Sequence, residues 1–193
     1  MNEHHKFCGS DVWREMVREK IIPWALHDAV LGDDVLEVGP GYGATTEVFR
    51  ERVGHLTAVE IDPELAGRLV ERFAGTNVTI VEGDATAMPL EDGRFTGAVC
   101  FTMLHHVPGA EQQDRLFAEV ARVLRPGAVL VATDSVYNPQ TEAAHEGDTY
   151  EPVDPTTLPA RLAAAGFADV EVELGESGWA ARATARRVAA PTG

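Results

Sequence analysis

The sequence predicts an α/β domain of the doubly wound type, in which a mostly parallel sheet carries helices on both faces. Short apolar runs alternate with amphipathic segments of helical period between residues 33 and 133, and this alternation is typical of βαβ units. Nearer the end of the chain, two strand-like segments flank Gly175-Glu176-Ser177-Gly178, which indicates a β-hairpin. We therefore expect a seven-stranded sheet with one antiparallel strand.

The first half of the chain predicts alternating helices and strands. Ser10 is a suitable N-cap for the first helix, which Pro23 should break or kink. Asp62-Pro63 supplies an N-cap and a first-turn proline for the third helix, and Gly75 ends it. The expected elements are helices over residues 11–31, 44–53 and 63–75, and strands over residues 33–38, 55–60 and 78–81.

The second half continues this pattern and then departs from it. Residues 96–102 and 128–133 predict buried strands, and the helix between them, residues 111–125, should end at Pro126-Gly127. Residues 88–93 look like a loop. Residues 135–154 have few periodic positions, so we expect a loop or lid there. A helix over residues 157–165 and strands over 170–174 and 179–188 complete the chain.

Composition narrows the class of protein. The 193 residues are enough for one domain, and 31 acidic residues against 16 basic ones give a net charge of -15, which repels polyanions and anionic membranes. Cys8 and Cys100 lie far apart and suggest neither a disulfide framework nor a zinc site. We expect a cytoplasmic protein, monomeric or homodimeric, that binds neither nucleic acid nor membranes.

The loop after the first strand is the expected ligand site, because open α/β sheets bind ligands beyond the carboxyl ends of their strands. Gly39, Gly41 and Gly43 let a ligand approach the main chain. Together with Ala44 and Glu60 they fit two ligands. One is a nicotinamide dinucleotide, with Glu60 on the ribose diol; the other is S-adenosylmethionine, held by the same loop and acid.

Three acidic residues help to decide between these ligands. Glu60 can accept charge-assisted hydrogen bonds from both ribose hydroxyls of either one. Glu37 precedes the glycines, where it would repel a pyrophosphate but attract an α-ammonium group, directly or through water. Asp84 follows the third strand and could accept from an adenine amino group, although an Asp after Gly also forms turns. S-adenosylmethionine is therefore favoured.

With these residues identified, the chain resembles the class I S-adenosylmethionine-dependent methyltransferases, in the small-molecule group that includes the ubiquinone and menaquinone biosynthesis enzymes. The resemblance covers residues 33–133 and implies a Rossmann-like sheet. The enzymes of this family transfer the methyl group to an O, N or C nucleophile and release S-adenosylhomocysteine. The resemblance rests on five motifs of this sequence: Val35-Leu36-Glu37-Val38-Gly39-Pro40-Gly41-Tyr42-Gly43, Val59-Glu60-Ile61-Asp62, Gly83-Asp84-Ala85, Leu104-His105-His106-Val107 and Leu124-Arg125-Pro126-Gly127.

The resemblance also implies roles for individual residues. Glu60 would take the ribose, Ile61 would pack on adenine, and Asp84 with the Ala85 amide would bind the adenine edge. Thr102 falls near the methionine end of the cofactor. The residues expected around the methionine part are Glu37, Gly39, Gly41 and Gly43. The implied organisation is a single domain, residues 1–193, with a helical segment over the pocket (1–31), a cofactor-binding core (33–134), a loop or lid (135–154), and a helix with a terminal hairpin (155–193).

The sequence says less about the residues that would act on the molecule receiving the methyl group. A sulfonium is already an activated methyl donor, so the protein chiefly aligns the reactants, and a hydroxyl or carbon acid also needs a base, for which His is suited. His105, His106 and His145 are the candidates, although packing or loop capping would explain them too. Adjacent His4 and His5 with Cys8 lack metal-ligand spacing, so we expect no metal.

The acceptor itself should be a small molecule, because no large substrate domain is present. Candidate pocket walls are Trp13, Tyr42, Tyr137 and Tyr150. The Asn/Asp-Pro-Pro-aromatic sequence of some nucleic-acid and protein methyltransferases is absent, which argues against amino methylation of adenine bases. Two alternatives stay open: a non-catalytic S-adenosylmethionine-binding protein, and an NAD(P)-dependent oxidoreductase, which the lack of any lysine after Lys20 disfavours.

Overall fold

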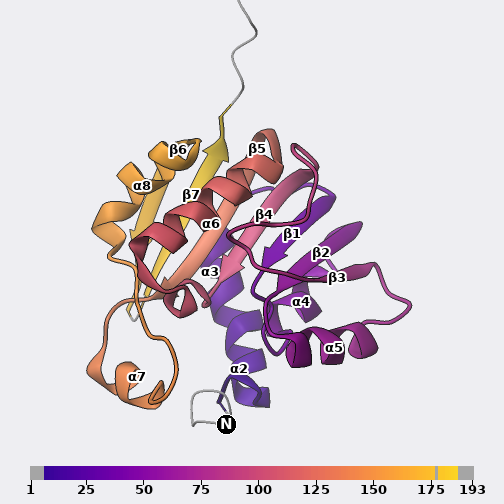
Figure 1. The fold of residues 1–193 in the computed structure, drawn as a ribbon, viewed down its shortest axis with the longest axis horizontal. Coiled ribbons are helices and arrows are strands. Elements are labelled where there is room, and N and C mark those ends of the chain that lie inside the picture. Colours follow the sequence, from indigo (N-terminus) through magenta and orange to yellow (C-terminus); the bar gives the residue numbers. More distant parts are fainter. Residues whose placement is uncertain (1–6, 177, 187–193) are drawn as a thin grey trace, which may run out of the picture.

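A seven-stranded sheet forms the centre of the computed structural model, which describes residues 7–176 and 178–186 (Figure 1). The strand order is β3-β2-β1-β4-β5-β7-β6. Only β7 runs against its neighbours β5 and β6, which confirms the predicted doubly wound sheet with one antiparallel strand. The strands are β1 (Asp34–Val38), β2 (His55–Glu60), β3 (Val78–Glu82), β4 (Phe95–Phe101), β5 (Leu124–Ser135), β6 (Phe167–Leu174) and β7 (Gly178–Ala185).

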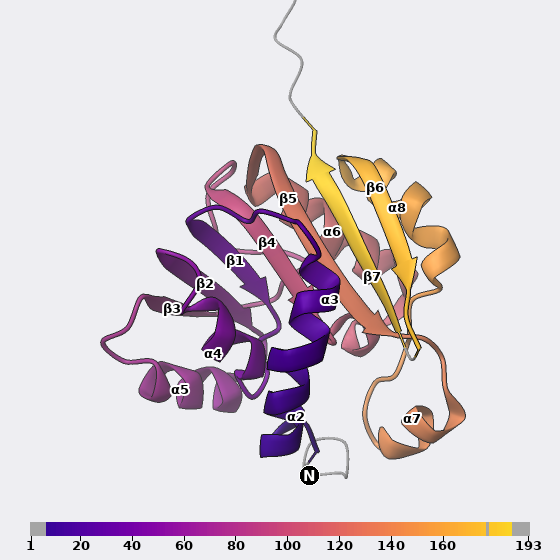
Figure 2. The ribbon, with the colours of Figure 1, turned by 180° about the vertical axis from the view of Figure 1, so that it is seen from behind.

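Helices cover both faces of the sheet. Figure 2 shows α2 (Asp11–Met16), α3 (Ile22–Leu26) and α4 (Ala44–Phe49) in front of one face, and Figure 1 shows α6 (Gly109–Val123) and α8 (Leu158–Ala165) in front of the other. Because strand side chains alternate between faces, Val35 of β1 packs in the same cluster as Phe49, while Leu36 packs with Phe117. Fully burying a side chain of this size stabilises the fold by about 1.5–3 kcal/mol. Helix α5 (Pro63–Arg72) packs against β2 and β3.

The N-terminal helical segment differs from its prediction. The Ser10 hydroxyl accepts from the Trp13 amide at 3.2 Å, which confirms the N-cap. The chain then stays helical through Pro23, by way of a π-helical turn over Val17–Ile21, and ends at Leu26 rather than at residue 31. Pro23 cannot donate to the carbonyl of Glu19, and a wider turn is one way to accommodate the missing bond. The proline therefore changes the winding of the helix without ending it.

The predicted lid contains a helix that was not expected. Helix α7 (Pro139–Ala144) begins after Asn138, whose side chain accepts from the amides of Gln140 and Thr141. Before it, β5 continues to Ser135, two residues past its predicted end. In both ribbon views α7 and α2 lie beyond the carboxyl ends of the parallel strands (Figures 1 and 2). The predicted lid segment thus contains a helix that lies beyond the edge of the sheet where a ligand is expected.

Smaller differences concern element ends. Helix α6 stops at Val123, so Pro126-Gly127 lies inside β5, beside the register shift between Phe95 and Gly97. The connection from β3 to β4 contains no helix, as predicted. The end of the last predicted strand, residues 187–188, lies outside the described residues. Within the described part of the chain, no helix combines the length and apolar character needed to cross a bilayer.

Candidate active site

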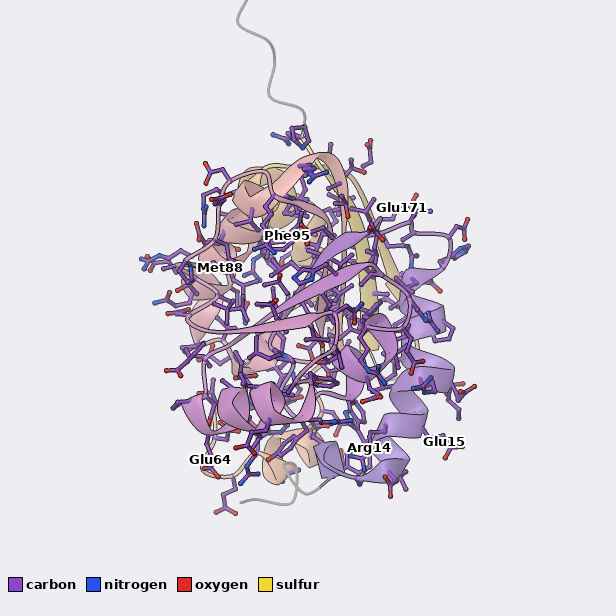
Figure 3. The ribbon with its side chains drawn as sticks, turned by 90° about the vertical axis from the view of Figure 1, so that its right-hand side faces the viewer. Arg14, Glu15, Glu64, Met88, Phe95 and Glu171 are labelled. Carbon is purple, nitrogen blue, oxygen red and sulfur yellow. The ribbon has the colours of Figure 1, made fainter. Side chains whose placement is uncertain are left out.

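A cavity of about 500 Å³ lies beyond the carboxyl ends of the parallel strands, at the position predicted for the ligand. Figure 3 shows Arg14 of α2 and Glu64 of α5 toward this same end of the molecule. We call it the cofactor cavity. Among its lining residues are the predicted site residues Gly39, Gly41, Glu60, Ile61, Asp84, Ala85, Thr102 and His106.

The glycine loop forms one wall of this cavity. Gly39 and Gly41 both have positive φ angles, +65° and +53°. A Cβ on Gly39 would lie 2.8 Å from Met103 Cγ, whereas a Cβ on Gly41 would point into open space. Gly39 therefore permits close packing of the loop on the segment after β4, and Gly41 leaves bare main chain facing the cavity.

Glu60 connects this loop to the end of β2. Its Oε2 accepts from the Gly41 amide at 2.9 Å and its Oε1 accepts from the Asp62 amide at 3.0 Å. The side chain is buried but lines the cavity. Because each carboxylate oxygen can accept more than one hydrogen bond, Glu60 can hold the loop and still bind a diol.

Another part of the cavity lining suits a flat aromatic ring. Ile61 is 66% exposed, unusual for a large apolar side chain, and it lines the cavity together with Ala85. The Oδ1 atom of Asp84 accepts from the Thr86 amide at 2.8 Å, so this residue does form the turn that was its alternative role. It also lines the cavity, and the turn fixes the direction of its carboxylate.

Two of the residues predicted to bind the cofactor lie outside the cavity lining. Glu37 is buried beneath the loop, where its Oε1 accepts from the Thr45 hydroxyl. Burial raises the pKa of Glu37 to about 7, and the Thr45 hydrogen bond opposes this shift. Gly43 packs against α5, since a Cβ there would lie 2.8 Å from Leu69 Cδ2. Neither residue is placed for direct contact with a ligand, and it is Thr45 that lines the cavity above Glu37.

A second cavity, of about 1150 Å³, adjoins the first. We call it the acceptor cavity. It lies among the N-terminal helices, α7 and the ends of β5, β6 and β7, and its lining includes Phe7, Trp13, Trp24, Thr102, His105, Asp134, Gln140, Thr141, Glu173 and Gly178. Cys8, Trp13 and Thr102 line both cavities. The two compartments therefore meet beside Thr102.

Thr102 holds a strained backbone at this junction. Its φ of +52° is rare for a β-branched residue, while its amide donates to the carbonyl of Thr133 at 2.7 Å. Residues in such conformations persist only where surrounding contacts enforce them, and they cluster at functional sites. Here the conformation turns the chain at the end of β4 between the two cavities.

The three candidate histidines lie together at the same junction. His106 lines the cofactor cavity, His105 lines the acceptor cavity, and His145 is buried beside both rings at centroid distances of 5.0 Å from His105 and 5.3 Å from His106. Burial lowers the pKa of His106 to about 4, and the neighbouring His105 acts in the same direction. Burial also lowers the pKa of His145. Both rings are therefore neutral at pH 7.

Asp134 is a site residue that the sequence analysis missed. Its Oδ1 lies 2.6 Å from His105 Nδ1, and its Oδ2 accepts from the His105 amide at 3.0 Å. An acid directly after a predicted strand was the available signal.

Of the aromatic residues predicted to form pocket walls, Trp13 and Tyr42 line cavities. Tyr137 is 59% exposed, and Tyr150 stacks on His145.

Comparison with known proteins identifies the family to which this chain belongs. Residues 36–132, half of the chain, match the family model described as a methyltransferase domain. The chain therefore belongs to the methyltransferase domain family. The same match disfavours the alternative of an NAD(P)-dependent oxidoreductase. A subgroup related to ubiquinone and menaquinone biosynthesis is not specifically indicated.

Solved structures share the fold. A SAM dependent methyltransferase from Aquifex aeolicus superimposes with a TM-score of 0.73 at 19% identity, covering 94% of this chain and 96% of that one. Phosphoethanolamine N-methyltransferase 2 from Haemonchus contortus, in complex with S-adenosyl-L-methionine, gives 0.66 at 15% identity and covers 81% of this chain and 49% of that one.

Curated relatives match over a shorter stretch. Ribosomal RNA small subunit methyltransferase A from Aromatoleum aromaticum is 52% identical over 88 residues, which is 44% of this chain and 32% of the relative. The enzyme of the same name from Bordetella pertussis is 36% identical over 91 residues. The chain spans about a third of the length of these curated relatives.

Proposed function

We propose that this protein transfers the methyl group of S-adenosylmethionine to a small molecule bound in the acceptor cavity. The observation that carries the proposal is the junction of the two cavities beside Thr102 and Trp13. A donor in one compartment and an acceptor in the other would meet there. A volume of about 1150 Å³ is enough for a metabolite-sized molecule.

The lining of the cofactor cavity supports one orientation of the donor. Adenine lies between Ile61 and Ala85 with its amino group toward Asp84, and the ribose hydroxyls donate to Glu60. The methionine part then follows the bare main chain at Gly41. In this orientation the sulfonium lies toward Thr102 and His106, which also line the cavity.

The chemistry requires alignment and one proton acceptor. The acceptor's lone pair attacks the methyl carbon in line with the carbon–sulfur bond, whose electrons leave with sulfur to give S-adenosylhomocysteine. A hydroxyl or carbon acid also loses a proton. We assign the removal of that proton to the histidine cluster, of which His106 lines the cofactor cavity.

Three features favour a small acceptor over RNA. The net charge of -15 opposes a polyanion. The strand β4 runs into Phe101-Thr102-Met103-Leu104 rather than an Asn/Asp-Pro-Pro-aromatic sequence. The acceptor cavity is lined largely by apolar groups, among them Trp13 and Trp24. The ribosomal RNA methyltransferases match 44% of this chain, and their substrate makes RNA the second candidate acceptor.

A labelling experiment separates these acceptors. The purified protein is incubated with S-adenosylmethionine carrying a tritiated methyl group and a cell extract, which is then divided into metabolite, RNA and protein fractions. We expect protein-dependent label in the metabolite fraction, and less of it with the Glu60→Ala variant at an S-adenosylmethionine concentration that does not saturate that variant. Label confined to RNA or protein would overturn the small-molecule assignment. Tight S-adenosylhomocysteine binding without label in any fraction would instead favour a non-catalytic binding protein.

A further inference from the structure

The three histidines come together from two distant segments of the chain. His105 and His106 lie in a 3₁₀ turn, Leu104–His106, that follows β4, and His145 is the C-cap of α7 in the lid. One ring nitrogen from each lies within 4.8 Å of the other two. His105 and His145 are 3% and 2% exposed, so the cluster is formed inside the protein.

Hydrogen bonds fix the orientation of two of these rings. His105 Nδ1 lies 2.6 Å from Asp134 Oδ1, and His145 Nδ1 lies 2.6 Å from the Thr141 carbonyl oxygen. A carboxylate and a carbonyl only accept, so each Nδ1 carries the hydrogen and each Nε2 carries a lone pair. Carboxylate and carbonyl acceptors behind an imidazole are the usual outer partners of metal-bound histidines.

The third ring has a carboxylate beside it. Asp148 Oδ2 lies 3.6 Å from His106 Nδ1, in the lid segment that also carries His145. The side chain of Asp134, by contrast, is fully buried and its oxygens also accept from the amides of His105 and Ser135. Asp134 is thus an orienting group for the cluster, and Asp148 is an additional oxygen donor at its edge.

We propose that His105, His106 and His145 bind one divalent transition-metal ion. Three imidazole ligands suit Zn²⁺ and other divalent first-row transition metals, whereas Mg²⁺ and Ca²⁺ prefer oxygen ligands. Three protein ligands also leave one tetrahedral position open, as in catalytic rather than structural zinc sites. Because His105 lines the acceptor cavity and His106 the cofactor cavity, the open position lies where the two meet.

Binding requires a small closure of the lid. Zinc–nitrogen bonds of about 2.0–2.1 Å set tetrahedral ligand atoms about 3.3 Å apart, whereas the three nitrogens here lie within 4.8 Å of one another. Drawing them together moves His145, and α7 with it, toward the turn after β4. The ion therefore ties the lid to the core of the domain.

The role of the ion rests on the proposed function. The acceptor's oxygen takes the open position, and the metal lowers the pKa of the hydroxyl bound to it, so that its proton passes to water. His106 then acts on that proton through the metal it holds, and not as a free base. The binding of the ion itself requires neither the donor nor the acceptor.

Zinc titration of the full chain tests the site. The protein is stripped with EDTA, dialysed and titrated calorimetrically with Zn²⁺, with Co²⁺ absorption as a measure of tetrahedral coordination. We expect one site per chain and a higher Tm with Zn²⁺. His145→Ala and His106→Ala should each weaken binding at least tenfold, and Asp134→Asn about tenfold to a hundredfold. His55→Ala, at the start of β2 and so at the other end of the sheet, should bind as the wild type does.

Two results would overturn the proposal. One is the absence of stoichiometric binding in a folded, S-adenosylhomocysteine-binding protein. The other is zinc binding that survives His145→Ala but is lost in a His4→Ala/His5→Ala variant, which would place the ion on the N-terminal segment. Since the titration uses neither cofactor nor acceptor, its failure leaves the proposed methyl transfer standing, and a failed acceptor assay leaves the zinc site standing.

Discussion

His105 and Asp134 form a buried pair in which one carboxylate holds both the ring and the main chain of its partner. Asp134 Oδ1 lies 2.6 Å from His105 Nδ1, and Oδ2 accepts from the His105 amide at 3.0 Å. The pair joins the end of β5 to the turn after β4, so a single acid fixes both the path of that turn and the direction of the imidazole. This fixed ring anchors the histidine cluster at the junction of the two cavities.

The first prediction concerns Glu60. Glu60→Ala removes the proposed ribose acceptor and the hydrogen bond to Gly41, and loss of about 1.5–3 kcal/mol should weaken binding of S-adenosylhomocysteine roughly tenfold to a hundredfold. Calorimetric titration measures the change. Glu64→Ala, an exposed acid in the next helix, is the matched control. An unchanged affinity in Glu60→Ala would remove the ribose assignment.

Gly41 and Gly43 give a paired prediction, because both have positive φ and alanine at either position carries a similar backbone strain. Only Gly41→Ala directs a methyl group into the cofactor cavity, so it should reduce affinity for S-adenosylhomocysteine. Gly43→Ala presses on Leu69 and should lower Tm more, with affinity nearly unchanged. Calorimetry and thermal unfolding of both variants test this. Similar affinities in the two variants would contradict the placement of the ligand along Gly41.

Local motifs were enough to predict one wall of the site. Gly41 and Asp84 follow predicted strands and Glu60 ends one, and the topology of a parallel sheet brings such positions to one edge. The burial of Glu37 could also have been predicted, from the alternation of side chains along the first strand. Residues two apart share a strand face, so Glu37 lies with Val35 on the side of α4, beneath the loop rather than in the crevice.

The histidine cluster beside the acceptor cavity could not be predicted from hydrophobic periodicity. His145 lies 40 residues from His105 along the chain, and its approach depends on how the lid folds back over the sheet. Metal-ligand spacing along the sequence therefore gave no sign of the cluster. Asp134 was within reach of the sequence analysis, since it follows the fifth predicted strand as Glu60 ends the second.

The raised pKa of Glu37 predicts a pH-dependent stability. Its pKa is about 7 in the folded protein against 4.5 ordinarily, because burial disfavours the charged form. The contribution of Glu37 to the free energy of unfolding is therefore fully present below about pH 4.5. It is lost as pH rises through 7, which lowers the stability by roughly 3 kcal/mol. Glu37→Gln avoids this cost. Its stability relative to the wild type should increase from pH 5 to pH 8 in denaturant unfolding, and parallel curves would contradict the shift.

The final prediction separates turnover from cofactor binding at His106. His106→Ala should lower kcat by roughly a hundredfold or more, since positioned groups that assist proton removal contribute about 10²–10⁴, while affinity for S-adenosylhomocysteine stays within about twofold. The reason lies in the proposed orientation, in which Glu60 and Asp84 bind the ribose and adenine of the cofactor and His106 lines the cavity near the reacting methyl group.

Single-turnover assays with the acceptor found by labelling measure the rate, and calorimetry measures the affinity. His55→Ala, whose ring bonds to Thr79 at the far end of the sheet, should match the wild type in both. A loss of affinity as large as the loss of rate would make His106 a cofactor-binding residue. Unchanged values in both assays would place proton removal elsewhere, whether the imidazole acts directly or through a bound ion.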